Sequence, residues 1–441
     1  MFKYRISDFC HLVDVGSGYM GIINSLTLGV LFMDTETAQM FKNATGKILH
    51  VPQDIPNELV EALIERRLIF QLGEREDLKD YLRAQNLLKD NGIAILYLLA
   101  TDGCNLGCAY CYIENALPED YKFSLMSKDT ADKALSLFID NISKTVDEPK
   151  VVIYGGEPLM NMEVVRYVID RFQQIKAESK VPEKTGLIIN TNATLIDESF
   201  LAFIQGKDVQ IAVSLDGSKE MHDEMRKYKD GRGTYDKVID NCNLMRQYGV
   251  DFGFSVTITK ANIHYMEEIL IMIHEEFGMS SVGFNIAINQ SEKVIGMTET
   301  QYAELVTKKL IRCFEISRNK GIYEDRIMRK VNAFVAGYPY IYDCGAPGDQ
   351  LVVSPDGMVG VCQSYCGSKK NFVPMEDLGK PAEHQIWSEW RYRSPLYQDQ
   401  CYDCISLAIC GGGCPYNAEL KTGSIWGIDE TFCIHSKNTV E

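Results

Sequence analysis

The sequence predicts an α/β fold: a parallel sheet with helices on its outer side, preceded by a small module and followed by a cysteine-rich part. Three observations predict it. From residue 90 onward, short runs rich in β-branched residues alternate with amphipathic segments, as in βα units. The first 88 residues mix strands with short helices instead. The last hundred residues hold eight of the fourteen cysteines.

The alternating region gives six βα-like units. The expected strands are residues 93–100, 151–154, 186–190, 209–215, 252–259 and 282–288. The expected helices are residues 127–143, 160–177, 197–205, 234–248 and 263–277, with Ser127 as the N-cap of the first. Because ligands bind at the carboxyl ends of parallel strands, polar motifs that follow these strands are expected to meet there.

The region before the sheet has the pattern of a small winged-helix-like module, residues 1–88. A hairpin is expected from residues 11–15 and 20–24, followed by helices at 35–43 and 57–67 and a strand at 68–70. A long helical stretch at 298–337 separates the sheet from the cysteine-rich part. The expected domains are therefore residues 1–88, 89–297, 298–343 (bridging helices) and 344–441.

Composition narrows the function classes. The chain has 441 residues and a formal charge of −16, with 61 acidic against 45 basic side chains, which argues against a nucleic-acid partner. The N-terminus has no apolar stretch of signal-peptide length, and the apolar run at residues 93–100 is too short to span a bilayer. Together with cysteines in cluster-like spacing, this predicts a reducing, cytoplasmic location.

The loop after the first strand of the sheet contains Cys104, Cys108 and Cys111, joined by glycines. Three thiolates so close in sequence can hold one iron–sulfur cluster. A cubane cluster normally takes four cysteine ligands, so this loop would leave one iron open for chemistry. The alternative is zinc, which is typically bound by paired CxxC units or by cysteine with histidine, and neither pattern is present in this loop.

With Tyr110 as the aromatic residue before its third cysteine, this loop resembles the signature of the radical S-adenosylmethionine (radical SAM) enzymes. The resemblance implies a partial (β/α)6, TIM-like barrel and an open iron that binds the amino and carboxylate groups of SAM. It also implies reductive cleavage of SAM to a 5′-deoxyadenosyl radical. Gly155, Gly156 and Glu157 resemble the family's GGEP motif, which holds the methionine amino group of SAM.

Four further residues resemble SAM-binding positions of the family. Asn192 would line the SAM pocket, Ser214 and Asp216 would contact its ribose and methionine parts, and Arg226 would pair with its carboxylate. Other readings stay open for two of them. Asn192 could instead form an Asx turn or a helix cap, and Arg226 could belong to a surface ion pair.

The C-terminal cysteines resemble the SPASM domain, which carries two auxiliary [4Fe–4S] clusters, so three clusters are expected in all. By that resemblance one auxiliary cluster has the ligands Cys344, Cys362 and Cys414, and the other has the ligands Cys401, Cys404, Cys410 and Cys433. Cys366 is either a fourth ligand of the first or free. Residues 352–362 are expected to form a hairpin that delivers Cys362. Cys10, Cys242 and Cys313 are expected to be small buried hydrophobic side chains.

SPASM-type radical SAM enzymes mostly modify peptides, and the N-terminal module resembles the leader-recognition elements of ribosomal-peptide maturases, which bind a leader as an added β-strand. The expected function is therefore a peptide maturase that forms an intramolecular thioether or carbon–carbon cross-link. The expected partners are a precursor peptide and a flavodoxin or ferredoxin as electron donor.

Three alternatives remain. An anaerobic sulfatase-maturing enzyme is disfavoured because Gln363, not an aspartate, follows Cys362, and glutamine is no general base. A non-catalytic iron–sulfur protein would not need Gly155, Gly156 and Glu157. A radical SAM enzyme acting on RNA is disfavoured by the acidic charge.

Overall fold

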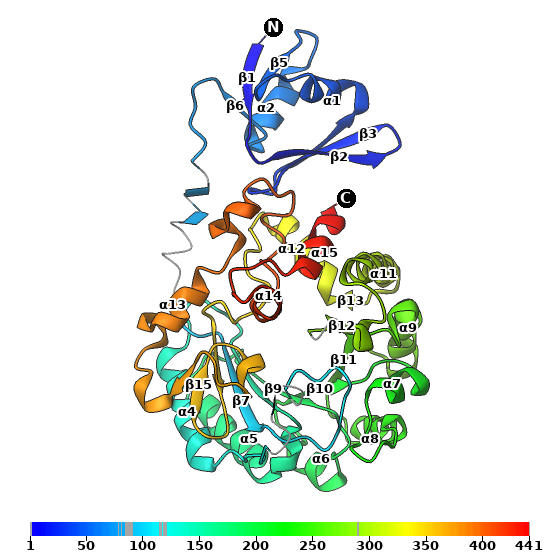
Figure 1. Cartoon of the computed structure of the whole chain (residues 1–441), viewed down its shortest axis with the longest axis vertical. Helices are drawn as coiled ribbons and strands as arrows, with labels where there is room; N and C mark the ends of the chain where they lie inside the picture. The colour runs from blue at the N-terminus through cyan, green and yellow to red at the C-terminus, as the bar shows by residue number, and fades with distance from the viewer. Residues whose placement is uncertain are drawn as a thin grey trace. The chain divides into compact units, whose positions relative to one another are not determined.

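The computed structural model describes residues 2–77, 79–80, 82–83, 91–113, 117, 121–288 and 291–440 (Figure 1). The chain forms two compact units. The first comprises residues 1–89, 327–344 and 393–441, and the second residues 90–326 and 345–392. The division into four consecutive domains stays a prediction. Its first boundary, between residues 88 and 89, lies outside the described residues.

The second unit is built on one large sheet, in which six parallel strands lie side by side in chain order. They are β7 (Ile95–Thr101), β8 (Lys150–Gly155), β9 (Gly186–Thr191), β10 (Gln210–Ser214), β11 (Phe252–Ile258) and β12 (Ser281–Ile286). Each coincides with a predicted strand to within two residues. The partial barrel of six βα units is therefore confirmed.

The sheet continues beyond these six strands at both ends. On one side β13 (Tyr323–Glu324) pairs parallel with β12. On the other, β14 (Gln350–Val353) pairs parallel with β7, and β15 (Met358–Gly360) and β16 (Phe372–Pro374) follow antiparallel. The hairpin expected at residues 352–362 is thus confirmed, and it belongs to the same sheet as the barrel strands.

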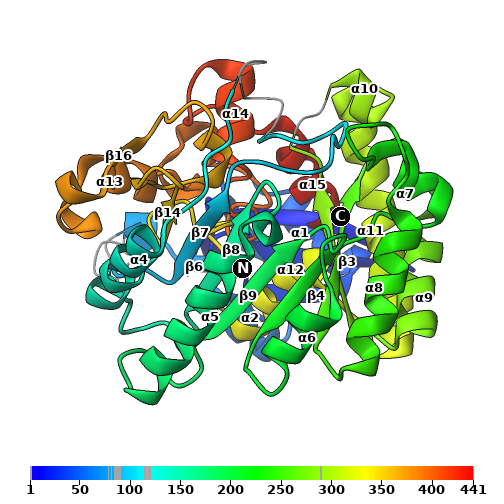
Figure 2. The same cartoon turned by 90° about the horizontal axis from the view of Figure 1, so that it is seen from below.

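Helices cover the outside of the barrel strands, as Figure 2 shows. They are α4 (Lys128–Asn141), α5 (Met162–Ala177), α6 (Glu198–Ile204), α7 (Lys219–Met225), α8 (Tyr235–Gln247) and α9 (Met266–Phe277). The Ser127 hydroxyl accepts the Thr130 N–H at 3.0 Å, which confirms the predicted N-cap. On α5, residues three and four positions apart, such as Val165, Val168 and Phe172, are buried, as an amphipathic helix requires.

The helical stretch expected at residues 298–337 is interrupted. It consists of α11 (Glu299–Lys320) and α12 (Asp325–Ala336), with β13 between them. Gly321 ends α11 in the left-handed conformation, at φ +71°, which glycine adopts without steric cost. The two residues of β13 then pair with β12. A strand of two residues leaves no periodic signal in the sequence, so this break could not be predicted.

The N-terminal part of the first unit contains two small antiparallel sheets. One has the strand order β5 (Ile48–Val51), β1 (Phe2–Ile6), β6 (Ile69–Gln71), and the other β2 (Cys10–Gly16), β3 (Tyr19–Asn24), β4 (Val30–Asp34). The hairpin predicted around residues 16–18 is confirmed as β2 and β3. The predicted helices are α1 (Thr35–Lys42) and α2 (Asn57–Glu65). The side chains of Ile22, Leu49 and Leu63 form part of their shared core.

The C-terminal part of this unit is mostly irregular and contains α14 (Pro415–Thr422) and α15 (Glu430–Val440). Between Cys410 and Cys414 lie three consecutive glycines with φ between +68° and +81°. Other residues rarely adopt this conformation, so the chain can fold back between these two cysteines only because the glycines are there. Among the described residues, no helix is long and apolar enough to cross a lipid bilayer.

Candidate functional site

Polar motifs follow four neighbouring strands of the barrel, at the edge where the strands end. The cysteine loop follows β7, Gly156 and Glu157 follow β8, Asn192 follows β9, and Asp216 lies two residues beyond β10. Since the four strands are parallel and adjacent, these motifs lie at one edge of the sheet, as expected from the sequence.

The cysteine loop is held by backbone hydrogen bonds to the segment that follows α7. The Gly107 N–H donates to the Lys227 carbonyl at 2.8 Å, and the Ala109 N–H donates to the Met225 carbonyl at 3.0 Å. The three cysteines of the loop are partly buried. The loop is therefore an ordered structure, tied at its middle to a segment more than a hundred residues away in sequence.

Gly155 and Gly156 allow the end of β8 to approach the start of this loop. A Cβ on Gly155 would lie 2.0 Å from the Thr101 carbonyl oxygen, and one on Gly156 would lie 2.2 Å from the Gly103 carbonyl oxygen. Across this contact the Gly156 N–H donates to Thr101 and the Glu157 N–H to Gly103, both at 2.9 Å. Any side chain at either glycine would separate the two backbones.

The carboxylate of Glu157 is buried and accepts three hydrogen bonds. They come from the Leu159 N–H at 3.0 Å, the Thr191 hydroxyl at 2.7 Å and the Asn192 N–H at 2.7 Å. Burial raises the pKa of Glu157 to about 7, although these hydrogen bonds act in the opposite direction. A carboxylate has about four acceptor positions, so one is left for a ligand. Its expected contact with the amino group of SAM stays a prediction.

Asn192 forms the Asx turn that was one of its two readings. Its side-chain oxygen accepts the Thr194 N–H at 3.0 Å and the Thr194 hydroxyl at 2.7 Å. Its amide nitrogen faces the cysteine loop, where it donates to Asn105 at 2.9 Å and lies 3.9 Å from the Cys104 sulfur. The turn thus holds Asn192 against the loop, and a SAM contact by Asn192 stays a prediction.

Asp216 is the centre of a buried polar network. Its Oδ2 accepts the Tyr110 hydroxyl at 2.5 Å and the Arg226 Nε at 2.8 Å, and its Oδ1 accepts the Thr257 N–H at 2.9 Å. The Arg226 guanidinium also lies over the Tyr110 ring, 5.1 Å from its centroid. Ser214 is the last residue of β10 and is partly buried beside Ser255 of β11.

Arg226 is a buried residue with 8% of its surface exposed, so its reading as a surface ion pair is wrong. Burial disfavours its charge, but Asp216 and Tyr110 outweigh this and raise the pKa of Arg226. Within the described residues its only side-chain hydrogen bond is the one from Nε to Asp216. The terminal nitrogens of a guanidinium can bind a carboxylate in a bidentate manner, which is the role expected for Arg226.

His222 holds this network together, and reasoning from the sequence did not assign it a role. Its Nδ1 accepts the Asp216 N–H at 3.3 Å, and its Nε2 lies 3.0 Å from the Thr234 hydroxyl. That hydroxyl donates to the Arg226 carbonyl at 3.1 Å, so Nε2 carries the proton. Burial lowers the pKa of His222 to about 4, so the ring is neutral at pH 7. In the sequence, the feature that could have pointed to His222 is its position between Asp216 and Arg226.

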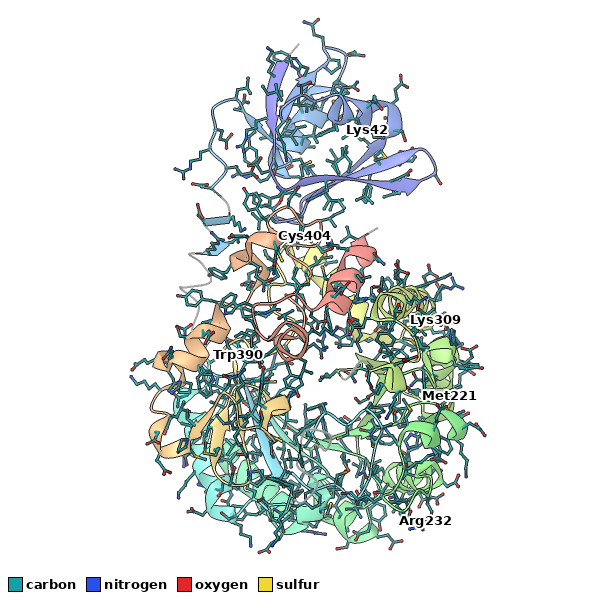
Figure 3. The ribbon with its side chains drawn as sticks, viewed as in Figure 1. Lys42, Met221, Arg232, Lys309, Trp390 and Cys404 are labelled. Atoms are coloured by element: carbon teal, nitrogen blue, oxygen red, sulfur yellow. The ribbon has the colours of Figure 1, made fainter. Side chains whose placement is uncertain are left out.

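Two of the C-terminal cysteines belong to the second unit. Cys362 and Cys366 are buried and flank the short helix η4 (Gln363–Tyr365) after β15. Tyr365 packs edge-on against Trp390, labelled in Figure 3, with ring centroids 5.9 Å apart. The hairpin β14–β15 and this aromatic contact fix the position of both thiols. Whether Cys366 is a ligand stays open.

The remaining C-terminal cysteines belong to the first unit: Cys344, Cys401, Cys404 (Figure 3), Cys410, Cys414 and Cys433. Burial, together with the neighbouring thiols of Cys410, Cys404 and Cys433, raises the pKa of Cys401 to about 12. These are the four residues that the sequence assigns to one auxiliary cluster. Soft thiol donors on a glycine-rich backbone fit an iron–sulfur cluster, and this ligand set stays a prediction.

The three cysteines outside the motifs differ in how deeply they are buried. Cys242 and Cys313 are fully buried, as expected of small hydrophobic side chains. Cys10 on β2 is partly buried and packs against the N-terminal core.

Comparison with known proteins agrees with this site. Residues 98–273 match the family model described as the radical SAM superfamily. The AdoMet-dependent heme synthase of Oleidesulfovibrio alaskensis is 30% identical over 341 residues, which cover 71% of this chain and 80% of that protein. The chain belongs to the radical SAM superfamily. Membership implies that it uses SAM and a [4Fe–4S] cluster, which the cysteine loop fits.

Other similarities extend over most of the chain. The radical SAM cyclopropyl synthase TigE of Paramaledivibacter caminithermalis is 23% identical over 401 residues, which cover 86% of this chain and 80% of TigE. Streptococcus suis SuiB bound to its precursor peptide SuiA matches with a TM-score of 0.55 at 16% identity, over 98% of this chain and 99% of SuiB. The structure of anSMEcpe with bound AdoMet matches with a TM-score of 0.65 at 20% identity, over 78% of this chain and 95% of the anSMEcpe chain.

The Gly156 contact leads to a first prediction. Gly156→Ala places a Cβ against the Gly103 carbonyl, which has to move and with it the cysteine loop, at a cost of about 1–3 kcal/mol. We expect the purified variant to retain less iron per chain and to cleave SAM more slowly under dithionite. Gly253→Ala is the matched control, because a Cβ there meets nothing within 4 Å. Equal iron content in both variants would contradict the proposed contact.

The neutral His222 leads to a prediction on pH. Because its pKa in the folded protein is about 4, below the unfolded value of 6.5, it contributes stability above pH 6.5 that is lost as the pH falls through 4. The contribution is on the order of 3 kcal/mol. The melting temperature of His222→Gln should therefore fall less steeply between pH 6.5 and 4 than that of wild type. The exposed His264→Gln is the control and should follow wild type; parallel curves for all three would refute the assignment.

Proposed function

We propose that this protein is a peptide maturase that forms an intramolecular thioether or carbon–carbon cross-link in a precursor peptide. The observation that carries the proposal is that one chain combines the barrel-edge site, two further sets of cysteines and a separate N-terminal β module. A SAM-cleaving enzyme needs only the first of these. The further cysteine sets suit an oxidative reaction. The N-terminal module suits a peptide that is bound through a segment other than the one that reacts.

When bound in this site, the cluster and SAM supply a 5′-deoxyadenosyl radical that removes one hydrogen atom from the substrate. Closing a cross-link also removes a proton and an electron. We assign the electron to the C-terminal cysteine sets as holders of two auxiliary clusters, which makes three clusters in all, with a flavodoxin or ferredoxin as donor for SAM cleavage. Arg226 would bind the SAM carboxylate through its terminal nitrogens, while Asp216 and His222 hold Arg226 in place.

The relatives support peptide cross-linking over other radical SAM reactions. SuiB, which the chain matches over nearly its full length, is described with a precursor peptide bound. TigE is named as a cyclopropyl synthase, and closing a cyclopropane ring makes a carbon–carbon bond. This favours the carbon–carbon form of the cross-link, with the thioether form as its alternative.

We place leader binding on the edge strand β4 of the N-terminal module. Among the described strands β4 pairs with β3 alone, so its outer backbone groups can accept an added strand. Its Phe32 side chain is 63% exposed and offers a leader peptide an apolar contact.

The alternative is maturation of a sulfatase, since the chain is also similar to anSMEcpe. The environment of Gln363 disfavours it. This residue follows Cys362, and its side-chain oxygen accepts the Gln350 Nε2 at 3.3 Å. An amide in this position cannot accept a substrate proton at neutral pH.

The reaction is tested with the product of a short reading frame beside the gene as the candidate precursor peptide. Anaerobically reconstituted protein with this peptide, SAM and dithionite should yield a product lighter by two hydrogens. Tandem mass spectrometry then separates the two forms, because a thioether requires a cysteine sulfur in the linked fragment. Deoxyadenosine formed without any mass change of the peptide contradicts the proposal. Formation of formylglycine in a sulfatase peptide supports the alternative: from Cys it exchanges sulfur for oxygen and removes two hydrogens, and from Ser it removes two hydrogens at one residue without linking two residues.

Leader binding is tested separately. Phe32→Asp should weaken binding of a fluorescent leader peptide roughly tenfold, as expected when an apolar anchor is lost from an interface. Phe2→Asp is a closely matched control: Phe2 is also 63% exposed, but β1 has a partner strand on both sides. Equal loss of affinity in both variants would rule out β4 as the binding edge.

A further inference from the structure

Arg393 is a fully buried cation in the cysteine-rich part of the first unit, with 1% of its surface exposed. Its side chain donates three hydrogen bonds: Nε to the Ile425 carbonyl at 2.7 Å, one terminal nitrogen to Gly427 at 2.9 Å and the other to Gly412. All three acceptors are neutral. Within the described residues, Arg393 has no carboxylate at ion-pair distance.

A buried charge without an opposite charge is strongly unfavourable, because neutral dipoles replace only part of its hydration. Burial accordingly lowers the pKa of Arg393, while Cys410, Asp429, Cys414 and Cys401 act against this. Most of the groups that favour its positive charge are thus cysteines.

Asp429 does not fill the role of counter-charge. Its carboxylate is buried and faces other donors: it accepts the Cys414 N–H at 3.0 Å, the Asn417 amide at 3.4 Å and the Phe432 N–H at 3.4 Å. Burial raises the pKa of Asp429.

The glycine run between Cys410 and Cys414 is shaped around Arg393. A Cβ on Gly412 would lie 2.6 Å from a terminal nitrogen of Arg393, and the Gly412 carbonyl accepts a hydrogen bond from that nitrogen. The guanidinium therefore lies directly against the turn that carries Cys410.

We propose that Arg393 is the counter-charge of the iron–sulfur cluster held by Cys401, Cys404, Cys410 and Cys433, and that it raises the reduction potential of this cluster. A cluster with four thiolate ligands is an anion, and reduction adds a further negative charge. A buried cation beside it stabilises the reduced form more than the oxidised form. This inference rests on the auxiliary cluster of the proposed function.

The test compares Arg393→Lys, which keeps the charge, with Arg393→Gln, which removes it and keeps two donors. Arg66→Gln, on the partly exposed end of α2, controls for the loss of one positive charge from the same unit. The midpoint potential is measured by an EPR-monitored dithionite titration in a background with Cys104, Cys108 and Cys111 replaced by Ala. Arg393→Gln should shift one cluster to a more negative potential, while the Lys and Arg66 variants stay near wild type. An unchanged potential at full iron content would overturn the proposal.

If Arg393→Gln loses the cluster, the proposal is tested by comparing the melting temperatures of the cluster-free proteins. After chelation, wild type keeps a buried charge without its counter-charge, so Arg393→Gln should melt at a higher temperature than wild type. A lower melting temperature would show that Arg393 only ties carbonyls together and would overturn the proposal. A Cys401→Ala variant that loses no iron would instead refute this auxiliary cluster, and with it the inference and the electron route assigned to it; the SAM-cleavage and peptide assays test the cross-linking reaction independently.

Discussion

The site depends on a close approach between two backbones, at Gly155 and Gly156. Here the end of β8 forms hydrogen bonds with Thr101 and Gly103, at a separation that leaves no space for a Cβ. The cysteine loop begins at this contact, so its first residues are held by the sheet itself. The sheet determines where the thiols lie, and the loop needs no disulfide or large core of its own to be ordered.

The other side of the loop is held by the segment after α7, and this attachment links the loop to the polar network. The Met225 and Lys227 carbonyls accept backbone N–H groups of the loop, and Arg226 lies between them. Its side chain points to Asp216 and lies over Tyr110, which belongs to the loop. The position of the guanidinium and the position of the thiols are therefore coupled through one short stretch of chain.

Much of this arrangement could be predicted from the sequence. Six strands and five of the six covering helices could be predicted because buried parallel strands are short β-branched runs between amphipathic segments, and the motifs could be predicted because they follow those strands. Helix α7 was not predicted from the sequence. What could not be predicted depends on contacts distant in sequence. The burial of Arg226 follows from its packing on Tyr110, and three of the N-terminal strands, β1, β4 and β5, gave no clear alternation. Two of the three hydrogen bonds of the Glu157 carboxylate join the end of β8 to the end of β9, which no single segment reveals.

Arg226 and Arg393 are both buried near cysteines, but their partners differ, and the difference matches the group that each arginine would face. Arg226 is paired with Asp216, so the pair is close to neutral and offers hydrogen-bond donors without excess charge. That suits the methionine end of SAM, which carries its own positive amino group next to the carboxylate. In the part of the chain that the structure describes, Arg393 donates its hydrogen bonds to carbonyl oxygens, and no carboxylate pairs with its charge. That suits an anionic cluster, because an uncompensated buried cation remains stable only where a bound group brings the opposite charge.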